Sequence, residues 1–207
     1  LSDCSCFFLR PILNHYDKIN INYHNEDDED RTFLIKAVLE SNSNAVKSLL
    51  GNSDIKLDEL DSEGLSAFIR ACLIEPNLKI LNLLSSDPEF DIHFISQYED
   101  MTALEASARM GNFVSIKYIL DNFPDIKDDN LYKAFLSSIK NEFDYCLKLL
   151  VDFYLKKFPK KSTDKILSEF KNAIKYDNDR FTLYKAKLKF AIRQSRTVPV
   201  DSDSDSF

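Results

Sequence analysis

The sequence predicts an all-α fold, built as a solenoid of helical hairpins and closed by C-terminal helices that do not belong to the repeat. Three observations support this prediction. A pattern of polar, small and apolar residues recurs along the chain with spacings of 30 to 36 residues. Each copy contains two short stretches with the apolar spacing of an amphipathic helix. The C-terminal quarter also has helical periodicity, but it lacks the recurring pattern.

The clearest copy of the pattern is TALEASARMGNFVSIKYIL, residues 102–120. It combines a helix containing small residues, a Gly-Asn turn and a second helix that ends in an apolar pair. The same frame fits from Thr32 and from Ser66, and a weaker copy starts near Tyr132, so that successive starts are 34, 36 and 30 residues apart. A period of about 33 residues with two helices per unit is typical of stacked repeats, in which each unit buries its apolar face against its neighbours.

The first residue of each copy is suited to begin a helix. Thr32, Ser66 and Thr102 are favourable N-cap residues, and Thr102 with Glu105 has the spacing of a capping box. Small residues then recur in the first helix of the unit, at Ala37, Ala71, Ser107 and Ala108. We therefore expect the first helices of neighbouring units to approach each other closely.

This frame resembles the ankyrin repeat, whose pattern is Gly-x-Thr-Pro-Leu-His-x-Ala-Ala, followed by Gly-His and a Leu-Leu pair. The resemblance covers residues 30–152, as three to four divergent repeats. The sequence departs from the family pattern, because no proline follows Thr32, Ser66 or Thr102 and no histidine stands in the fourth place. The resemblance implies an ankyrin-like solenoid, with an inner and an outer helix in each unit.

The family pattern has a glycine two residues before the N-cap, where the chain turns between units. Gly64 keeps this glycine, whereas Asp30 and Asp100 replace it. Aspartate tolerates the left-handed backbone conformation better than most residues. We therefore predict positive φ angles at all three positions.

The two ends of the chain lie outside the clear repeats. Residues 1–29 are interpreted as a partial repeat or N-terminal cap with an acidic loop, and its missing first half suggests a piece of a longer protein. Residues 153–196 contain two amphipathic helices without the repeat frame, and we predict that they form a basic helical cap on the array. The composition of residues 197–207 predicts a disordered acidic tail.

Charge and cysteine content narrow the class of protein. Residues 1–131 carry 11 Lys/Arg against 24 Asp/Glu, whereas residues 132–207 carry 16 against 10. The sequence has neither a transmembrane-length apolar run nor the pattern of a signal peptide. The four cysteines are too few and too scattered for a disulfide scaffold, and Cys72 and Cys146 stand among apolar residues. These features predict an intracellular protein without a membrane partner, and leave nuclear and cytoplasmic locations open.

Metal and catalytic sites are not predicted. Cys4 and Cys6 are closer than the usual metal-binding pair, and His15 and His24 do not form a second rigid pair with them. No nucleophile motif and no phosphate-binding glycine loop is present. We expect no enzyme activity, no cofactor and no small-molecule substrate.

The resemblance instead implies a binding surface. In ankyrin arrays the turn tips and the exposed ends of the inner helices form a concave face, and places 8 and 9 of the frame lie on it. Together with the acidic tips, the predicted partner-binding residues are Leu39, Glu40, Glu63, Leu73, Ile74, Glu99, Arg109, Met110, Ile139 and Lys140. An exposed apolar strip with acidic edges predicts a docking groove for a peptide or helix of another protein. The alternative is a register error of one residue, which would make these core positions.

A second candidate surface is basic. It includes Lys156, Lys157, Lys160, Lys161 and Lys165. Such a patch is suited to phosphates or an acidic partner, although lysines spread round helices are often simply solvated. The predicted function is thus a non-catalytic scaffold or adaptor module of a larger protein; the alternative is a nucleic-acid or chromatin-associated module. Ankyrin arrays this divergent resemble those of fungal transcription and chromatin regulators, poxviruses and intracellular bacterial effectors.

Overall fold

The computed structural model describes residues 20–97, 100–173 and 178–197. The regular elements of these residues are one 3-10 helix, η1 (Glu26–Asp28), and ten α-helices. The α-helices of the repeats are α2 (Phe33–Leu39), α3 (Ser43–Leu49), α4 (Ala67–Leu73), α5 (Leu78–Ser85), α6 (Ala103–Arg109), α7 (Phe113–Asn122), α8 (Asp128–Lys140) and α9 (Asp144–Lys157). Two further helices follow, α10 (Thr163–Ala173) and α11 (Asn178–Thr197).

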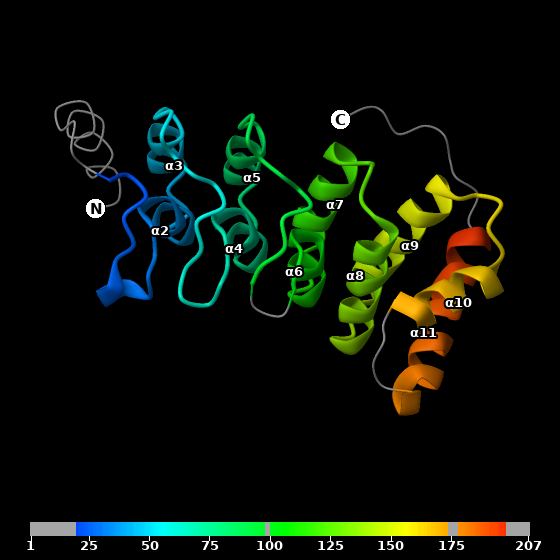
Figure 1. Cartoon of the computed structure of the whole chain (residues 1–207). Helices are drawn as coiled ribbons and strands as arrows, with labels where there is room; N and C mark the ends of the chain where they lie inside the picture. Colours follow the sequence, from blue (N-terminus) through cyan, green and yellow to red (C-terminus); the bar gives the residue numbers. More distant parts are fainter. Residues whose placement is uncertain (1–19, 98–99, 174–177, 198–207) are drawn as a thin grey trace.

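The repeat helices form two rows. Helices α2, α4, α6 and α8 pack in order as the inner row, and α3, α5, α7 and α9 pack as the outer row. Each inner helix also packs against the outer helix that follows it, so the repeating unit is a helical hairpin. In Figure 1, α3 and α5 lie above α2 and α4, and the loops between units project on the opposite side. The prediction of an all-α solenoid is confirmed.

The N-caps of the inner helices are mostly as predicted. The hydroxyl of Thr32 accepts a hydrogen bond from Ile35 N at 3.2 Å, and that of Thr102 accepts one from Glu105 N at 3.3 Å. Ser66 occupies the N-cap position of α4 but makes no side-chain cap bond.

The outer helices use a capping residue that the sequence analysis did not assign. The side-chain oxygens of Asn42, Asn77 and Asn112 each accept a hydrogen bond from the backbone N–H three residues later. Asparagine is among the favoured N-cap residues because this bond satisfies one of the free N–H groups of the first turn. In the first three units both helices therefore begin at a polar N-cap residue, whereas α8 and α9 begin at Lys127 and Phe143 without a side-chain cap bond.

The turns between units adopt the predicted left-handed conformation. The φ angles are 53° at Asp30, 69° at Gly64 and 48° at Asp100, which confirms that aspartate replaces glycine at two of these turns. Each turn lies in a loop closed by one β-bridge, and we call these loops finger 1 (25–31), finger 2 (60–66) and finger 3 (95–102, of which 98 and 99 are not described). Backbone hydrogen bonds, Ser62 N to Glu29 O and Gln97 N to Gly64 O, connect each finger to the next.

The turn from inner to outer helix shows that the fourth repeat was misaligned by one residue. Gly111 N bonds to Ala108 O in the third unit, and Glu142 N bonds to Ile139 O in the fourth. Ile139 is therefore equivalent to Ala108, a core position, and the frame starts at Lys133 rather than Tyr132.

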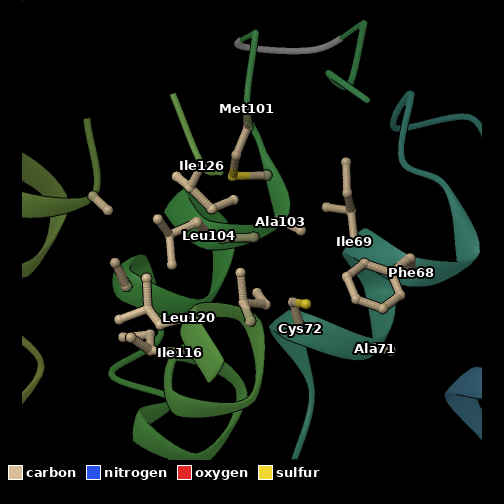
Figure 2. Close-up of a cluster of buried hydrophobic side chains, with 14 of the residues drawn as sticks. Phe68, Ile69, Ala71, Cys72, Met101, Ala103, Leu104, Ile116, Leu120 and Ile126 are labelled. Atoms are coloured by element: carbon tan, nitrogen blue, oxygen red, sulfur yellow. The ribbon is translucent and has the colours of Figure 1, made fainter. Parts of the chain in front are cut away.

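Small residues allow close packing between the inner helices. Ala71 and Cys72 of α4 and Ala103 and Leu104 of α6 belong to one cluster of buried apolar side chains (Figure 2), and all four are at most 3% exposed. Burial raises the pKa of the Cys72 thiol to about 12, so this thiol stays protonated and unreactive at neutral pH.

The last two helices close the array. Helix α10 packs against α8, whereas α11 packs against α9, α8 and α10. Phe170 of α10 is fully buried against the rings of Tyr132 and Phe135 of α8. Helix α9 extends to Lys157, beyond the predicted start of the cap at residue 153, and α11 extends to Thr197, one residue beyond its predicted end. Residues 1–19 and 198–207, with most of the predicted N-terminal cap and acidic tail, lie outside the described residues.

The turn at Gly111 gives a testable prediction. Its φ is 66°, and a Cβ there would lie 2.7 Å from the Phe143 ring. We expect Gly111→Ala to lower the free energy of unfolding by roughly 1–3 kcal/mol, through left-handed strain and overpacking. The matched control is Ser41→Gly at the equivalent turn, where φ is 52° and glycine removes strain. Urea denaturation of both variants checks this, and an unchanged Gly111→Ala midpoint would contradict it.

Candidate functional site

Finger 1 carries a dense group of carboxylates, only some of which are neutralised. Arg31 pairs with Asp28 at 3.0 Å and also with Glu29. Lys36 of α2 donates a hydrogen bond to Asp28 at 2.5 Å, and this bond is the main cause that lowers the pKa of Asp28. Glu26 and Asp27 are exposed and form no ion pair with the described residues. The tip of finger 1 therefore keeps a net negative charge.

Finger 2 is built around a buried carboxylate. Asp61 accepts hydrogen bonds from Glu63 N and Leu65 N, each at 3.1 Å, and from Arg70 Nε at 2.6 Å. Arg70 also reaches Glu63 at 3.1 Å, while the Glu63 side chain is 57% exposed. Asp61 therefore has a structural role, and Glu63 is the finger 2 carboxylate that faces solvent.

His24 joins finger 1 to the segment before finger 2. Its Nε2 lies 3.0 Å from Glu59 Oε2, and its Nδ1 lies 2.8 Å from Asp30 O. The hydrogen bond with Glu59 raises the pKa of His24. Both ring nitrogens thus have protein partners, and the described residues contain no group of His, Cys, Asp and Glu side chains that would hold a metal. The other candidate ligands, Cys4, Cys6 and His15, lie outside these residues.

The predicted docking residues at the ends of the inner helices differ in exposure. Met110 is 53% exposed, and Glu40, Arg109 and Lys140 are exposed as well. Three others are partly buried and pack against the core, namely Leu39, Leu73 and Ile74.

One predicted docking residue is wrong and another is not described. Ile139 is only 2% exposed, because the one-residue shift of the fourth repeat places it in the core. Asn141, which is exposed, takes the place equivalent to Met110. Glu99 lies outside the described residues.

Further apolar side chains are exposed at the start of the outer helices, where the sequence analysis did not place them. Leu78 of α5 is 50% exposed, and Phe113 and Val114 of α7 are 43% and 39% exposed. A hollow of about 460 Å³ separates the two helix starts and is lined by Ser41, Glu75, Pro76, Asn77, Leu78 and Val114. We call this surface, together with Met110, the turn edge. For Leu78 and Phe113 the signal in the sequence is an apolar residue directly after an asparagine cap, a position that faces solvent.

The predicted basic patch is smaller than expected. Lys156, Lys160 and Lys165 are exposed. Lys161 instead lies 2.7 Å from both Glu169 Oε2 and the Tyr154 hydroxyl, and Lys157 donates a hydrogen bond to Ile126 O at 2.9 Å. Lys157 is exposed as well, and its bond to Ile126 lies within the last repeat. The expectation that all five lysines form a free surface is therefore wrong for Lys161, which connects α9 to α10 through Tyr154 and Glu169.

Comparisons with known proteins find similar solved structures but no similar sequence. No family model matches the sequence, and no curated protein matches it. The crystal structure of EF0377, an ankyrin repeat protein, matches with a TM-score of 0.64 and 16% identity over 92% of each chain. The human ASB11 ankyrin repeat domain matches with a TM-score of 0.54 and 14% identity, over 94% of this chain and 95% of that one.

Two observations complete the description of the molecule. None of its described helices has both the length and the apolar character needed to cross a membrane. The stacked hairpins, the left-handed turns and the likeness to both solved structures over more than nine-tenths of the chain agree with one another. The chain has the fold of an ankyrin-repeat domain.

Proposed function

We propose that the chain is a non-catalytic protein-interaction module, serving as a scaffold or adaptor within a larger protein. Its ligand is a peptide or helix of another protein, bound along the concave face between the fingers and the turn edge. The ankyrin-repeat fold supports this proposal, because a stack of repeats presents an extended surface for binding. The other support is the composition of that surface.

The exposed apolar side chains of the turn edge carry the proposal. Met110 at the end of α6 is 53% exposed, and Leu78 and Val114 line the hollow of the turn edge. Apolar side chains grouped around a hollow, on a surface with polar borders, are typical of a protein-binding site. A partner that fills the hollow would remove this apolar area from water, and so gain binding free energy.

Charge indicates which partner fits. Glu75 lines the hollow, and the exposed carboxylates of Glu26, Asp27 and Glu40 lie on the fingers and at the end of α2. A segment with apolar side chains flanked by lysine or arginine would match both features. Opposite charges at the rim would mainly favour rapid association and selection against acidic competitors.

A selection experiment tests this function. Peptides of about 16 residues are selected from a random phage library on the full chain, and we expect enrichment of large apolar residues flanked by Lys or Arg. Binding of a selected peptide, measured by fluorescence polarisation, should weaken at least tenfold in Met110→Glu, because a charge would be buried against apolar atoms. Leu183→Glu is the control, because it also replaces an exposed apolar side chain by a carboxylate, but on α11, where Leu183 is 57% exposed. Enrichment of acidic peptides, or equal loss in both variants, would refute the proposal.

Nucleic-acid binding is the second candidate function, and would place the chain in a chromatin-associated assembly. The observation in its favour is the exposure of Lys156, Lys160 and Lys165. Phosphate binding weakens steeply with salt because counterions are released, whereas apolar docking does not. Measuring the affinity for duplex DNA and for the selected peptide at low and high salt separates the two functions.

A further inference from the structure

Helix α11 has an apolar stripe on the side that faces away from the array. Its buried side chains, Tyr184, Leu188, Ala191 and Ile192, are at most 6% exposed. Leu183 and Phe190 are 57% and 63% exposed, and Ala186 between them is exposed too. With about 3.6 residues per turn, positions i, i+3 and i+7 lie on one side of a helix, here opposite the buried side.

The stripe continues across a hollow onto α9. Tyr145, near the start of α9, is 83% exposed. The hollow between the two helices has a volume of about 610 Å³, with apolar walls from Tyr145, Leu147, Ala186, Phe190 and Ala191. Its polar lining residues are Asp144, Lys148, Lys187 and Gln194. Two helices and a hollow thus present apolar side chains over about two turns of α11.

The charges that α11 itself contributes around the stripe are all positive, whereas α9 contributes Asp144 to the hollow. Residues 181–197 contain five Lys or Arg and no Asp or Glu. Lys187 pairs with Glu142 at 3.5 Å, and Arg196 donates a hydrogen bond to Thr163 at 3.1 Å. The other three cations, Lys185, Lys189 and Arg193, are exposed and form no ion pair with any residue of the described part of the chain. By helical geometry Arg193 and Lys189 border the stripe on one side, and Lys187 borders it on the other.

We propose that this α9–α11 surface docks an amphipathic helix of a partner protein, one with large apolar residues along one face and Asp or Glu beside them. Charge complementarity selects this occupant, because carboxylates beside the partner's apolar face would meet Lys189 and Arg193, which pair with no described carboxylate, whereas Lys187 is already paired with Glu142. Phe190, Leu183 and Tyr145 would be covered by the apolar face, in the helix-in-groove mode. Duplex DNA fits less well, because phosphates would pair with the cations but leave these three side chains without an apolar partner.

This surface differs from the concave face in both position and charge. The concave face carries exposed carboxylates and selects a basic segment, whereas the α9–α11 surface selects an acidic one. A partner suited to one surface is repelled by the other. The two surfaces therefore select different partners and can be tested independently.

The test uses the full chain and a synthetic helical peptide of about 18 residues, or five turns, with leucines along one face and glutamates on its flanks. Two control peptides replace the glutamates by lysine or the leucines by serine. We expect the acidic peptide to bind in fluorescence polarisation and both control peptides to bind at least tenfold more weakly. The double variant Leu183→Ser/Phe190→Ser should lose at least tenfold in affinity, and Tyr145→Ser provides an independent variant on another helix.

Matched charge variants complete the test. Lys185→Glu/Lys189→Glu/Arg193→Glu should weaken binding of the acidic peptide at least tenfold. The control Lys156→Glu/Lys160→Glu/Lys165→Glu has the same change in charge but lies outside α11, and should change the affinity less than threefold, as should Met110→Glu. Equal weakening by the two triple variants, equal binding of the serine peptide, or tighter binding of a DNA duplex than of the acidic peptide would overturn the proposal.

Discussion

Phe170→Ala is expected to lower the free energy of unfolding by about 3–5 kcal/mol, the usual cost of deleting a fully buried aromatic ring. Phe170 is 0% exposed, and its ring centroid lies 6.2 Å from that of Tyr132, 6.5 Å from that of Phe135 and 6.4 Å from that of Phe181. It therefore links α10 to the last inner helix and to α11. Its loss would leave a cavity between the final repeat and the helices that cover it.

The matched control is Phe190→Ala on α11. Phe190 is 63% exposed, so its truncation should change the free energy of unfolding by no more than about 0.5 kcal/mol. Urea denaturation followed by circular dichroism measures both values. An effect of Phe170→Ala as small as that of Phe190→Ala would show that the C-terminal helices do not unfold together with the repeats.

The size of the Phe170 effect follows from the architecture of a repeat protein. Each hairpin buries its apolar side only against its neighbours, so the last one needs a cover. Here the cover is aromatic, because Tyr132 and Phe135 of the last repeat meet Phe170 of α10, and Tyr154 packs against Tyr132. The exposed side of α11 then becomes the new end of the array, and it is this end that carries the α9–α11 surface.

Local rules predicted most of the fold. The spacing of small and apolar residues located the hairpins, because each unit must bury the same positions. Hydroxyl side chains at Thr32 and Thr102 located two helix starts. Asp30 and Asp100 were recognised as substitutes for glycine because both residue types reach the left-handed conformation that the turn requires.

The fourth repeat shows why such rules fail in register. Ser137-Ser138 matched the small pair of the other units by size, but the equivalent pair is Ser138-Ile139. A large residue fits in the small position here, where α8 and α9 are longer than the helices of the earlier repeats. A shift of one residue on a helix turns a side chain by about 100°, which is enough to move Ile139 from the predicted surface into the core.

The candidate surfaces were harder to predict because exposure depends on packing between units. The core contains the same residue types as the exposed positions Leu78, Phe113 and Val114. Only the placement of the helix starts shows that these three side chains face solvent. Lys161 shows the opposite case, because lysine is usually a solvated surface residue but here its side chain is paired within the protein. Its partner Glu169 lies on the next helix, in a contact that no local pattern indicates.

The Lys161–Glu169 contact leads to the second large effect, a loss of stability in acid that depends on Glu169. Glu169 Oε2 accepts hydrogen bonds from Lys161 Nζ at 2.7 Å, from the Tyr132 hydroxyl at 2.7 Å and from the Tyr154 hydroxyl at 3.1 Å. Burial opposes the charge of this carboxylate, but the three hydrogen bonds outweigh it and lower its pKa from 4.5 to about 2. Because the folded-state pKa is depressed, the carboxylate stabilises the folded chain above its unfolded pKa, and this stabilisation is lost as the pH falls from 4.5 toward about 2.

Glu169→Gln should therefore lower the free energy of unfolding by roughly 1.5–3 kcal/mol at neutral pH, the usual range for hydrogen bonds to a charged group. The difference between wild type and variant should shrink below pH 4.5 and vanish below about pH 2, where the wild-type carboxyl also becomes neutral in the folded chain. The control is Glu142→Gln, whose side chain is 81% exposed and 3.5 Å from Lys187, and it should change stability by at most about 1 kcal/mol. A Glu169→Gln deficit that stays constant from neutral pH to pH 2 would assign the effect to packing, because only an ionised carboxylate makes the difference depend on pH.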